Sequence, residues 1–146
     1  MIIGIDPGKS GGIAVIDRNG IAAAHKMPAT IGDLWDLIHE IKASNKTRER
    51  RSGFAYLEKV HAMPRQGVVS TFTFGHGFGA LEMALTAAGI PYELVTPNKW
   101  MKAMGCQTGG DKNVTKAAAQ RLFPELTITH AIADALLIAE YGRRNR

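Results

Sequence analysis

Residues 1–26 read MIIGIDPGKSGGIAVIDRNGIAAAHK, and this stretch decides which fold the sequence forms. Residues 1–6 predict a buried strand, and residues 12–17 predict a second strand after a turn rich in glycine. The pair Asn19-Gly20 is a strong signal for a hairpin turn. Residues 21–26 should therefore pair with the second strand, which predicts a meander of three antiparallel strands.

The rest of the chain predicts alternating helices and strands. Apolar residues recur at helical spacing over about residues 31–43, where Thr30 and Asp33 have the pattern of a capped helix start. Phe54–Glu58 is short, apolar and aromatic-rich, which is typical of a central strand. Further along we expect an irregular segment over 60–79, a helix from there to about 88, a strand over 92–95, and helices over 97–104, 111–123 and 129–143. This order predicts one α/β domain over residues 1–146, with a mixed five-stranded sheet flanked by helices.

The composition limits the class of protein and its partners. With 146 residues and 45% hydrophobic content, the chain can bury one core but is too short for two ordinary domains. Its formal net charge of +5 favours polyanionic partners, nucleic acid first. The lone Cys106 excludes an internal disulfide and a zinc site built from several thiolates. Without a signal peptide or a long apolar run, we expect a soluble cytoplasmic protein.

Two carboxylates lie at the ends of apolar strands. Asp6 ends the first strand, and Glu58 ends the strand over 54–58. If these strands are neighbours in the sheet, the two like charges lie close together and need a cation between them. The alternatives are that Asp6 caps the turn after it, and that Glu58 pairs with Lys59 or an arginine.

The last helix contains a third carboxylate in an apolar setting. From Ala131 to Ala139, Asp134 is the only polar side chain, so the helix is buried and this carboxylate needs a partner. His130 lies one turn earlier on the same face, where its imidazole could bind a metal or simply begin the helix. Oxygen-rich ligands favour Mg²⁺ or Mn²⁺ over zinc, and two such ions roughly 4 Å apart can hydrolyse a phosphodiester.

These motifs resemble those of the RuvC-type Holliday junction resolvases. The resemblance rests on Ile3-Gly-Ile-Asp-Pro-Gly8, Ser10-Gly-Gly-Ile-Ala-Val-Ile16, Tyr56-Leu-Glu58 and Ala133-Asp-Ala-Leu136, which span the chain in this order. It implies a ribonuclease H-like fold, a homodimer, bound Mg²⁺ or Mn²⁺, and paired nicks in a four-way DNA junction. It also implies a bacterial or phage-infected cell as the setting.

By the same resemblance, Asp6, Glu58 and Asp134 fall on metal ligands of the family. In typical bacterial members the penultimate ligand precedes the last Asp by three residues, a position that is Ala131 here. The candidate His130 lies four residues before, which resembles the chloroplast and phage-type members. Either spacing keeps both side chains on one helix face.

Several residues are candidates for DNA contact. Aromatic and apolar side chains after Glu58 could stack on or wedge between bases at a branch point, or belong to the core or to a dimer contact. The lysines could bind phosphates or be merely solvated, as could the basic segment over 42–51. The candidates are His61, Met63, Arg65, Phe74, Lys99, Lys102, Lys112 and Lys116.

Three other functions compete with junction resolution. A YqgF-like nuclease acting on RNA would share the opening strand. A nucleotide-binding protein of the sugar-kinase type would share a phosphate loop like residues 6–10, but it needs a second domain. A DNA-binding module without catalysis would not require Asp134 in a buried helix.

Overall fold

The sheet has five strands in the order β3-β2-β1-β4-β5. Strands β1 (Ile2–Asp6), β2 (Gly12–Ile16) and β3 (Ala22–Lys26) form the antiparallel meander. Strands β4 (Phe54–Glu58) and β5 (Tyr92–Val95) then add in parallel to β1. The predicted mixed five-stranded sheet is confirmed. This computed structural model describes residues 1–44, 53–61, 67–107, 109 and 111–146.

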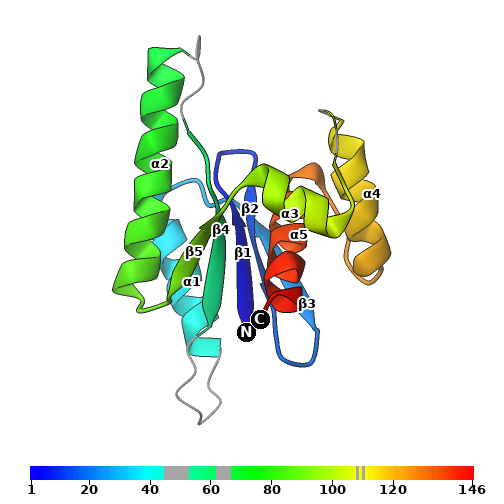
Figure 1. The fold of residues 1–146 in the computed structure, drawn as a ribbon. Coiled ribbons are helices and arrows are strands. Elements are labelled where there is room, and N and C mark those ends of the chain that lie inside the picture. The colour runs from blue at the N-terminus through cyan, green and yellow to red at the C-terminus, as the bar shows by residue number, and fades with distance from the viewer. Residues whose placement is uncertain (45–52, 62–66, 108, 110) are drawn as a thin grey trace.

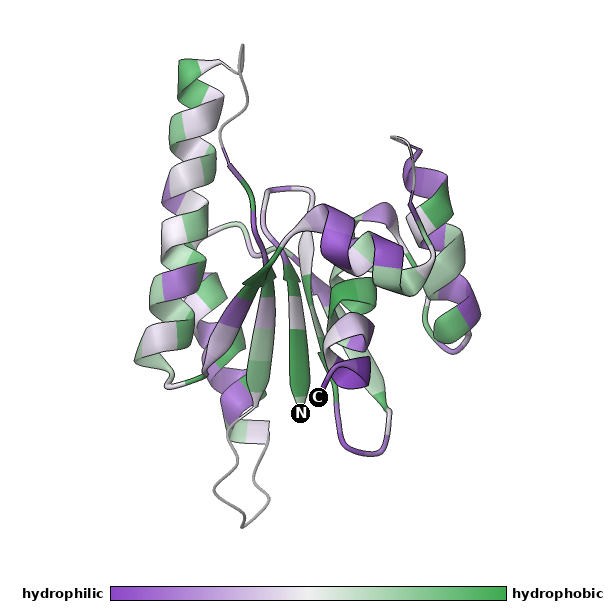
Figure 2. Ribbon diagram, in the orientation of Figure 1, coloured by the Kyte–Doolittle hydropathy of each residue, from purple (hydrophilic) through white to green (hydrophobic). Residues whose placement is uncertain are grey.

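Helices cover both faces of the sheet (Figure 1). Helices α1 (Ile31–Ser44) and α2 (Val68–Ala87) bury one apolar cluster against one face. Helices α3 (Pro97–Met104), α4 (Lys112–Leu122) and α5 (His130–Arg144) bury a second cluster against the other. In Figure 2 the central strands are mainly hydrophobic, whereas hydrophobic and hydrophilic residues alternate along the helices. None of the described helices combines the length and apolar character that crossing a membrane requires.

Local sequence signals form the expected turns and caps. The Thr30 hydroxyl donates to the Asp33 carboxylate at 2.7 Å and accepts from the Asp33 amide at 3.1 Å, which starts α1 as predicted. In the β2–β3 turn, the Asp17 carboxylate accepts the amides of Asn19 and Ile21. These contacts confirm the hairpin and the helix start.

The prediction of an irregular segment over residues 60–79 is wrong for most of its length. Helix α2 begins at Val68 and continues through Gly75, Gly77 and Gly79. Each glycine costs about 1 kcal/mol relative to alanine inside a helix. The C-terminal half of α2 is fixed by packing, however, and lengthening an existing helix is much cheaper than starting one. The packed C-terminal half therefore stabilises the N-terminal half of α2, which reaches beyond the ends of the strands (Figure 1).

Helix α5 lies directly on the backbone of the first two strands. A Cβ atom on Gly4 of β1 would come within 2.2 Å of the Ala135 carbonyl oxygen and 2.3 Å of the Ala139 nitrogen. One on Gly12 of β2 would come within 2.7 Å of the Ala131 carbonyl oxygen. Only glycine permits this close approach, which brings the start of α5 to the end of β1.

Gly4→Ala should destabilise the protein by about 2 kcal/mol or more, because the added methyl group meets helix backbone that cannot move aside easily. Chemical denaturation measures the change. Gly32→Ala is the matched control, since among the described residues outside its own helix backbone its new Cβ would meet the Thr30 hydroxyl oxygen alone, at an ordinary contact distance of 3.7 Å. The control should be neutral or stabilising, and equal losses in both variants would contradict the close approach.

Candidate active site

Two predicted site carboxylates lie at the same edge of the sheet. Strands β1 and β4 are parallel neighbours in which Ile5 pairs with Leu57. Asp6 and Glu58 follow these two residues directly, at the carboxyl ends of the two strands. The proposed adjacency of the strands is confirmed.

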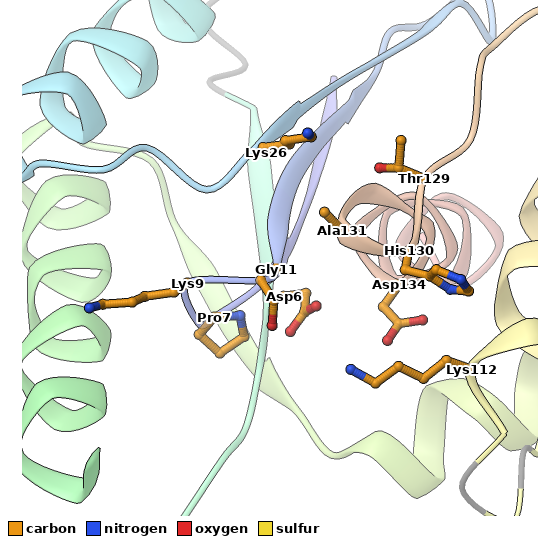
Figure 3. A pocket seen from close by; sticks show the side chains of 11 residues that line it. Asp6, Pro7, Lys9, Gly11, Lys26, Lys112, Thr129, His130, Ala131 and Asp134 are labelled. Atoms are coloured by element: carbon orange, nitrogen blue, oxygen red, sulfur yellow. The ribbon is translucent and has the colours of Figure 1, made fainter. Parts of the chain in front are cut away.

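The first turns of α5 bring Asp134 and His130 to this edge. Gly12 pairs with Asp6 in the sheet, and the carbonyl of Ala131 lies over Gly12 because no side chain intervenes. A pocket of about 550 Å³ opens here, and its lining includes Asp6, His130 and Asp134. In Figure 3 the carboxylates of Asp6 and Asp134 point toward the same space, with His130 beside Asp134.

Burial and mutual repulsion make these carboxylates difficult to ionise together. The pKa of Asp6 is raised to about 8, first by burial and then by the charges of Glu58 and Asp134, while Lys112 opposes the shift. Burial also raises the pKa values of Glu58 and Asp134. For Asp134, the neighbouring Thr115 hydroxyl and the charges of Lys112 and His130 act in the opposite direction. The site thus brings carboxyl groups together where their charges, once formed, repel one another and are not fully screened by water.

The carboxylates differ in their hydrogen-bond partners. The Trp100 indole N–H donates to Oε1 of Glu58 at 2.8 Å. Oδ1 of Asp134 is buried and accepts no hydrogen bond from the residues that the structure describes. Within the described part of the chain, neither Asp6 nor Glu58 forms an ion pair, so the alternative pairing of Glu58 with Lys59 is not observed.

The donor set fits a hard divalent cation. An unsatisfied buried carboxylate oxygen on Asp134 and mutually repelling oxygen ligands are what Mg²⁺ or Mn²⁺ would stabilise. Among the described residues, no three His, Cys, Asp or Glu side chains lie close enough together to hold a metal ion by themselves. Mg²⁺ usually relies on one or two carboxylates completed by water and substrate phosphate, so an open arrangement of Asp6, Glu58 and Asp134 remains compatible with such an ion.

Lys112 is the predicted DNA-binding lysine that lies in the site. Its ammonium group points toward the space between Asp6 and Asp134 (Figure 3), and its charge opposes the rise in the pKa values of both carboxyls. Lys116, one turn later on α4, is half-buried. Among the predicted lysines, Lys112 is therefore the one that lines this pocket.

The other predicted DNA contacts are spread around this edge. Phe74 lies near the β1–β2 turn, since a Cβ on Gly8 would be 3.7 Å from its ring. Lys99 pairs with Glu93 at 3.4 Å. His61 and Lys102 are exposed, whereas Met63 and Arg65 lie outside the described residues, as does most of the basic segment over 42–51.

The structure adds residues that sequence reasoning did not assign to the site. Lys9, Lys26 and Thr129 line the pocket, although Lys9 points away from the carboxylates in Figure 3. Trp100 contacts Glu58 from α3. A buried tryptophan usually has a hydrogen-bond acceptor for its N–H. Trp100, in the helix after β5, could therefore have been expected to contact a polar group.

Comparison with known proteins identifies the fold. No protein-family model matches the sequence, and no curated protein sequence matches it. The structure of T. thermophilus RuvC in complex with a Holliday junction substrate is similar, with a TM-score of 0.67, 18% identity, and coverage of 99% of this chain and 94% of that one. A second Thermus thermophilus RuvC structure has a TM-score of 0.61 and 20% identity, covering 99% and 95% of the two chains. The chain therefore has the RuvC-type, ribonuclease H-like fold.

Proposed function

We propose that this protein is a metal-dependent endonuclease that resolves four-way DNA junctions. The observation that carries the proposal is the convergence of Asp6, Glu58 and Asp134 at one sheet edge of a RuvC-type fold, where each has a raised pKa. Partly buried carboxylates with perturbed pKa values at or beside a pocket are typical of catalytic sites. We take residues 1–146 to act as a single nuclease domain.

Asp6, Glu58, Asp134 and His130 would hold the Mg²⁺ or Mn²⁺ ions, which we propose number two. Bound ions of this kind supply an activated water and stabilise the departing 3′ oxygen in phosphodiester hydrolysis. These four side chains would position the ions relative to a bound phosphate. Lys112 is positioned to neutralise charge on the scissile phosphate, because its ammonium group already faces the carboxylates.

The substrate assignment is drawn from the similar structure that contains a Holliday junction. The net charge of +5 supports a polyanionic substrate. The N-terminal half of α2 extends past the carboxyl ends of β1 and β4 (Figure 1) and exposes 75% of Phe72. An aromatic side chain there, with Phe74 against the neighbouring turn, can stack on bases unpaired at a branch point.

A substrate panel tests this function. The protein is incubated with labelled four-way junction, fork, linear duplex and RNA–DNA hybrid, each with Mg²⁺, Mn²⁺ or EDTA. We expect paired, symmetric nicks in the junction with either metal and none with EDTA. Cleavage of the hybrid but not of the junction would overturn the assignment and favour an RNA-directed nuclease.

We propose that a second copy of the chain covers the outer face of α1 and α2. This face exposes large apolar side chains, including Ile31 at 52% and Met83 at 62%. A groove between the two helices is lined by Ile31, Trp35 and Met83 among others. Exposed apolar surface of this kind marks an interaction site, and paired nicks require two active sites.

Met83→Glu should shift the protein from dimer to monomer, because a carboxylate in an apolar contact loses its hydration. Sedimentation velocity without DNA measures this, and the association constant should fall at least about tenfold. Ala117→Glu, on the exposed side of α4 across the sheet, is the control. A monomeric parent, or a dimer unaffected by Met83→Glu, would contradict the assignment of this face.

His130 is the least constrained of the proposed ligands, because its side chain is exposed at the start of α5. His130→Ala should lower junction cleavage about tenfold or more, whereas His130→Asp should keep part of the activity, since a carboxylate can also hold a hard cation. Single-turnover cleavage rates measure both variants. If His130→Ala cleaves like the parent, the site has three carboxylates and His130 only begins the helix.

A further inference from the structure

We propose that Trp100 is a positioning residue that holds Glu58 so that one of its carboxylate oxygens remains available to a divalent cation. The inference rests on the proposed metal centre and adds a residue to it. It starts from the 2.8 Å hydrogen bond between the Trp100 indole N–H and Oε1 of Glu58.

The backbone places the indole over the end of β4. Glu58 pairs with Val95 of β5, and the amide of Lys59 donates to the Val95 carbonyl at 2.7 Å. The next residue, Thr96, is the N-cap of α3, and its carbonyl accepts the Trp100 amide at 3.3 Å. The first turn of α3 is therefore fixed to the strand end that carries Glu58.

Packing then fixes the ring itself. Trp100 has 0% exposure and belongs to the apolar cluster beneath α5, together with Val95 and Leu136. A ring enclosed in this way has little freedom to rotate. Its N–H direction is consequently set by the core.

The chemistry of the pair gives Glu58 a defined orientation. The indole nitrogen only donates, so it occupies one carboxylate oxygen and leaves Oε2 for another partner. Glutamate has one more rotatable bond than aspartate. A fixed hydrogen-bond donor therefore restricts the orientation of the Glu58 carboxylate more than it would restrict that of Asp6 or Asp134. Asp134, in contrast, has a buried oxygen with no hydrogen-bond partner among the described residues. Residues that orient metal ligands through hydrogen bonds typically change metal affinity ten- to a hundredfold when replaced.

The test measures metal binding in the absence of DNA. Mn²⁺ binding to the full chain is followed by electron paramagnetic resonance for the parent, Trp100→Phe, Glu58→Gln and the double variant. We expect Trp100→Phe to weaken Mn²⁺ binding about tenfold or more, and to add little in the Glu58→Gln background. Metal-free junction binding should not change, while the single-turnover cleavage rate should fall.

Two further variants distinguish a positioning role of Trp100 from a role in packing alone. Ile16 belongs to the same apolar cluster as Trp100 but lies at the end of β2 that is far from Asp6. Ile16→Val should therefore lower the stability of the protein and leave its Mn²⁺ affinity unchanged. If Trp100→Phe does not fold, 3-benzothienylalanine at position 100 keeps the ring shape and replaces only the N–H. Parent-like Mn²⁺ affinity in the variant lacking the N–H, or the same loss in the Glu58→Gln background, would overturn the positioning role.

These outcomes are distinguishable from failure of the proposed function. A parent protein that binds no Mn²⁺ would overturn both the metal centre and the role of Trp100. A parent that binds Mn²⁺ but cleaves a substrate other than the junction would overturn only the substrate assignment. The Trp100 result would then still apply to the metal centre.

Discussion

Asp6→Asn, Glu58→Gln and Asp134→Asn should each lower junction cleavage by at least about a hundredfold while junction binding is retained. Each substitution keeps the side-chain shape but removes the charge that a divalent cation requires. Binding depends mainly on phosphate contacts by basic residues, so it should survive. Single-turnover cleavage with Mg²⁺ and gel-shift binding with EDTA measure the two effects separately.

The controls for these variants are carboxylates remote from the site. Asp36→Asn on α1 and Glu125→Gln between α4 and α5 remove the same charge from exposed positions. Both should cleave at the parental rate. Parental activity in any one of the three site variants would remove that residue from the proposed centre.

The metal-free parent should lose stability relative to Asp6→Asn as pH rises. The pKa of Asp6 is about 8 in the folded protein, against roughly 4 for an unfolded aspartate. Between these values the folded state retains a proton that the unfolded state has released, so the free energy of unfolding falls with increasing pH. Above pH 8 the folded protein bears the full cost of the buried charge, on the order of a few kcal/mol.

Denaturation curves from pH 4 to pH 9 measure the difference between the two proteins. Asp6→Asn should become progressively more stable than the parent over this range, and the difference should level off above about pH 8. Mg²⁺ should stabilise the parent at pH 8 more than it stabilises the variant. The change of this difference with pH is the decisive observation. An asparagine without a hydrogen-bond partner also lowers the free energy of unfolding of the variant, but by an amount that does not depend on pH. A difference that stays constant from pH 5 to pH 9 would contradict the raised pKa.

The sequence alone predicted the elements whose signals are local. The three-strand meander follows from apolar alternation and the Asn19-Gly20 turn, and α1 follows from its Thr30 and Asp33 cap. The burial of α5 around Asp134 follows from a helix that is apolar nearly all round. The sequence also predicted that Asp6 and Glu58 end buried strands. Each of these signals lies within a few residues of the feature it specifies.

Only the tertiary structure decided which side chains meet across elements. The N-terminal half of α2 is helical despite its glycines, because packing fixes the C-terminal half that it extends. Lys112 faces the carboxylates while Lys99 pairs with Glu93, although both are lysines in or near short helices. The Trp100 contact with Glu58 joins residues 42 positions apart. Such pairings depend on how closely helices approach the sheet, and here that distance is set by Gly4 lying against the backbone of α5.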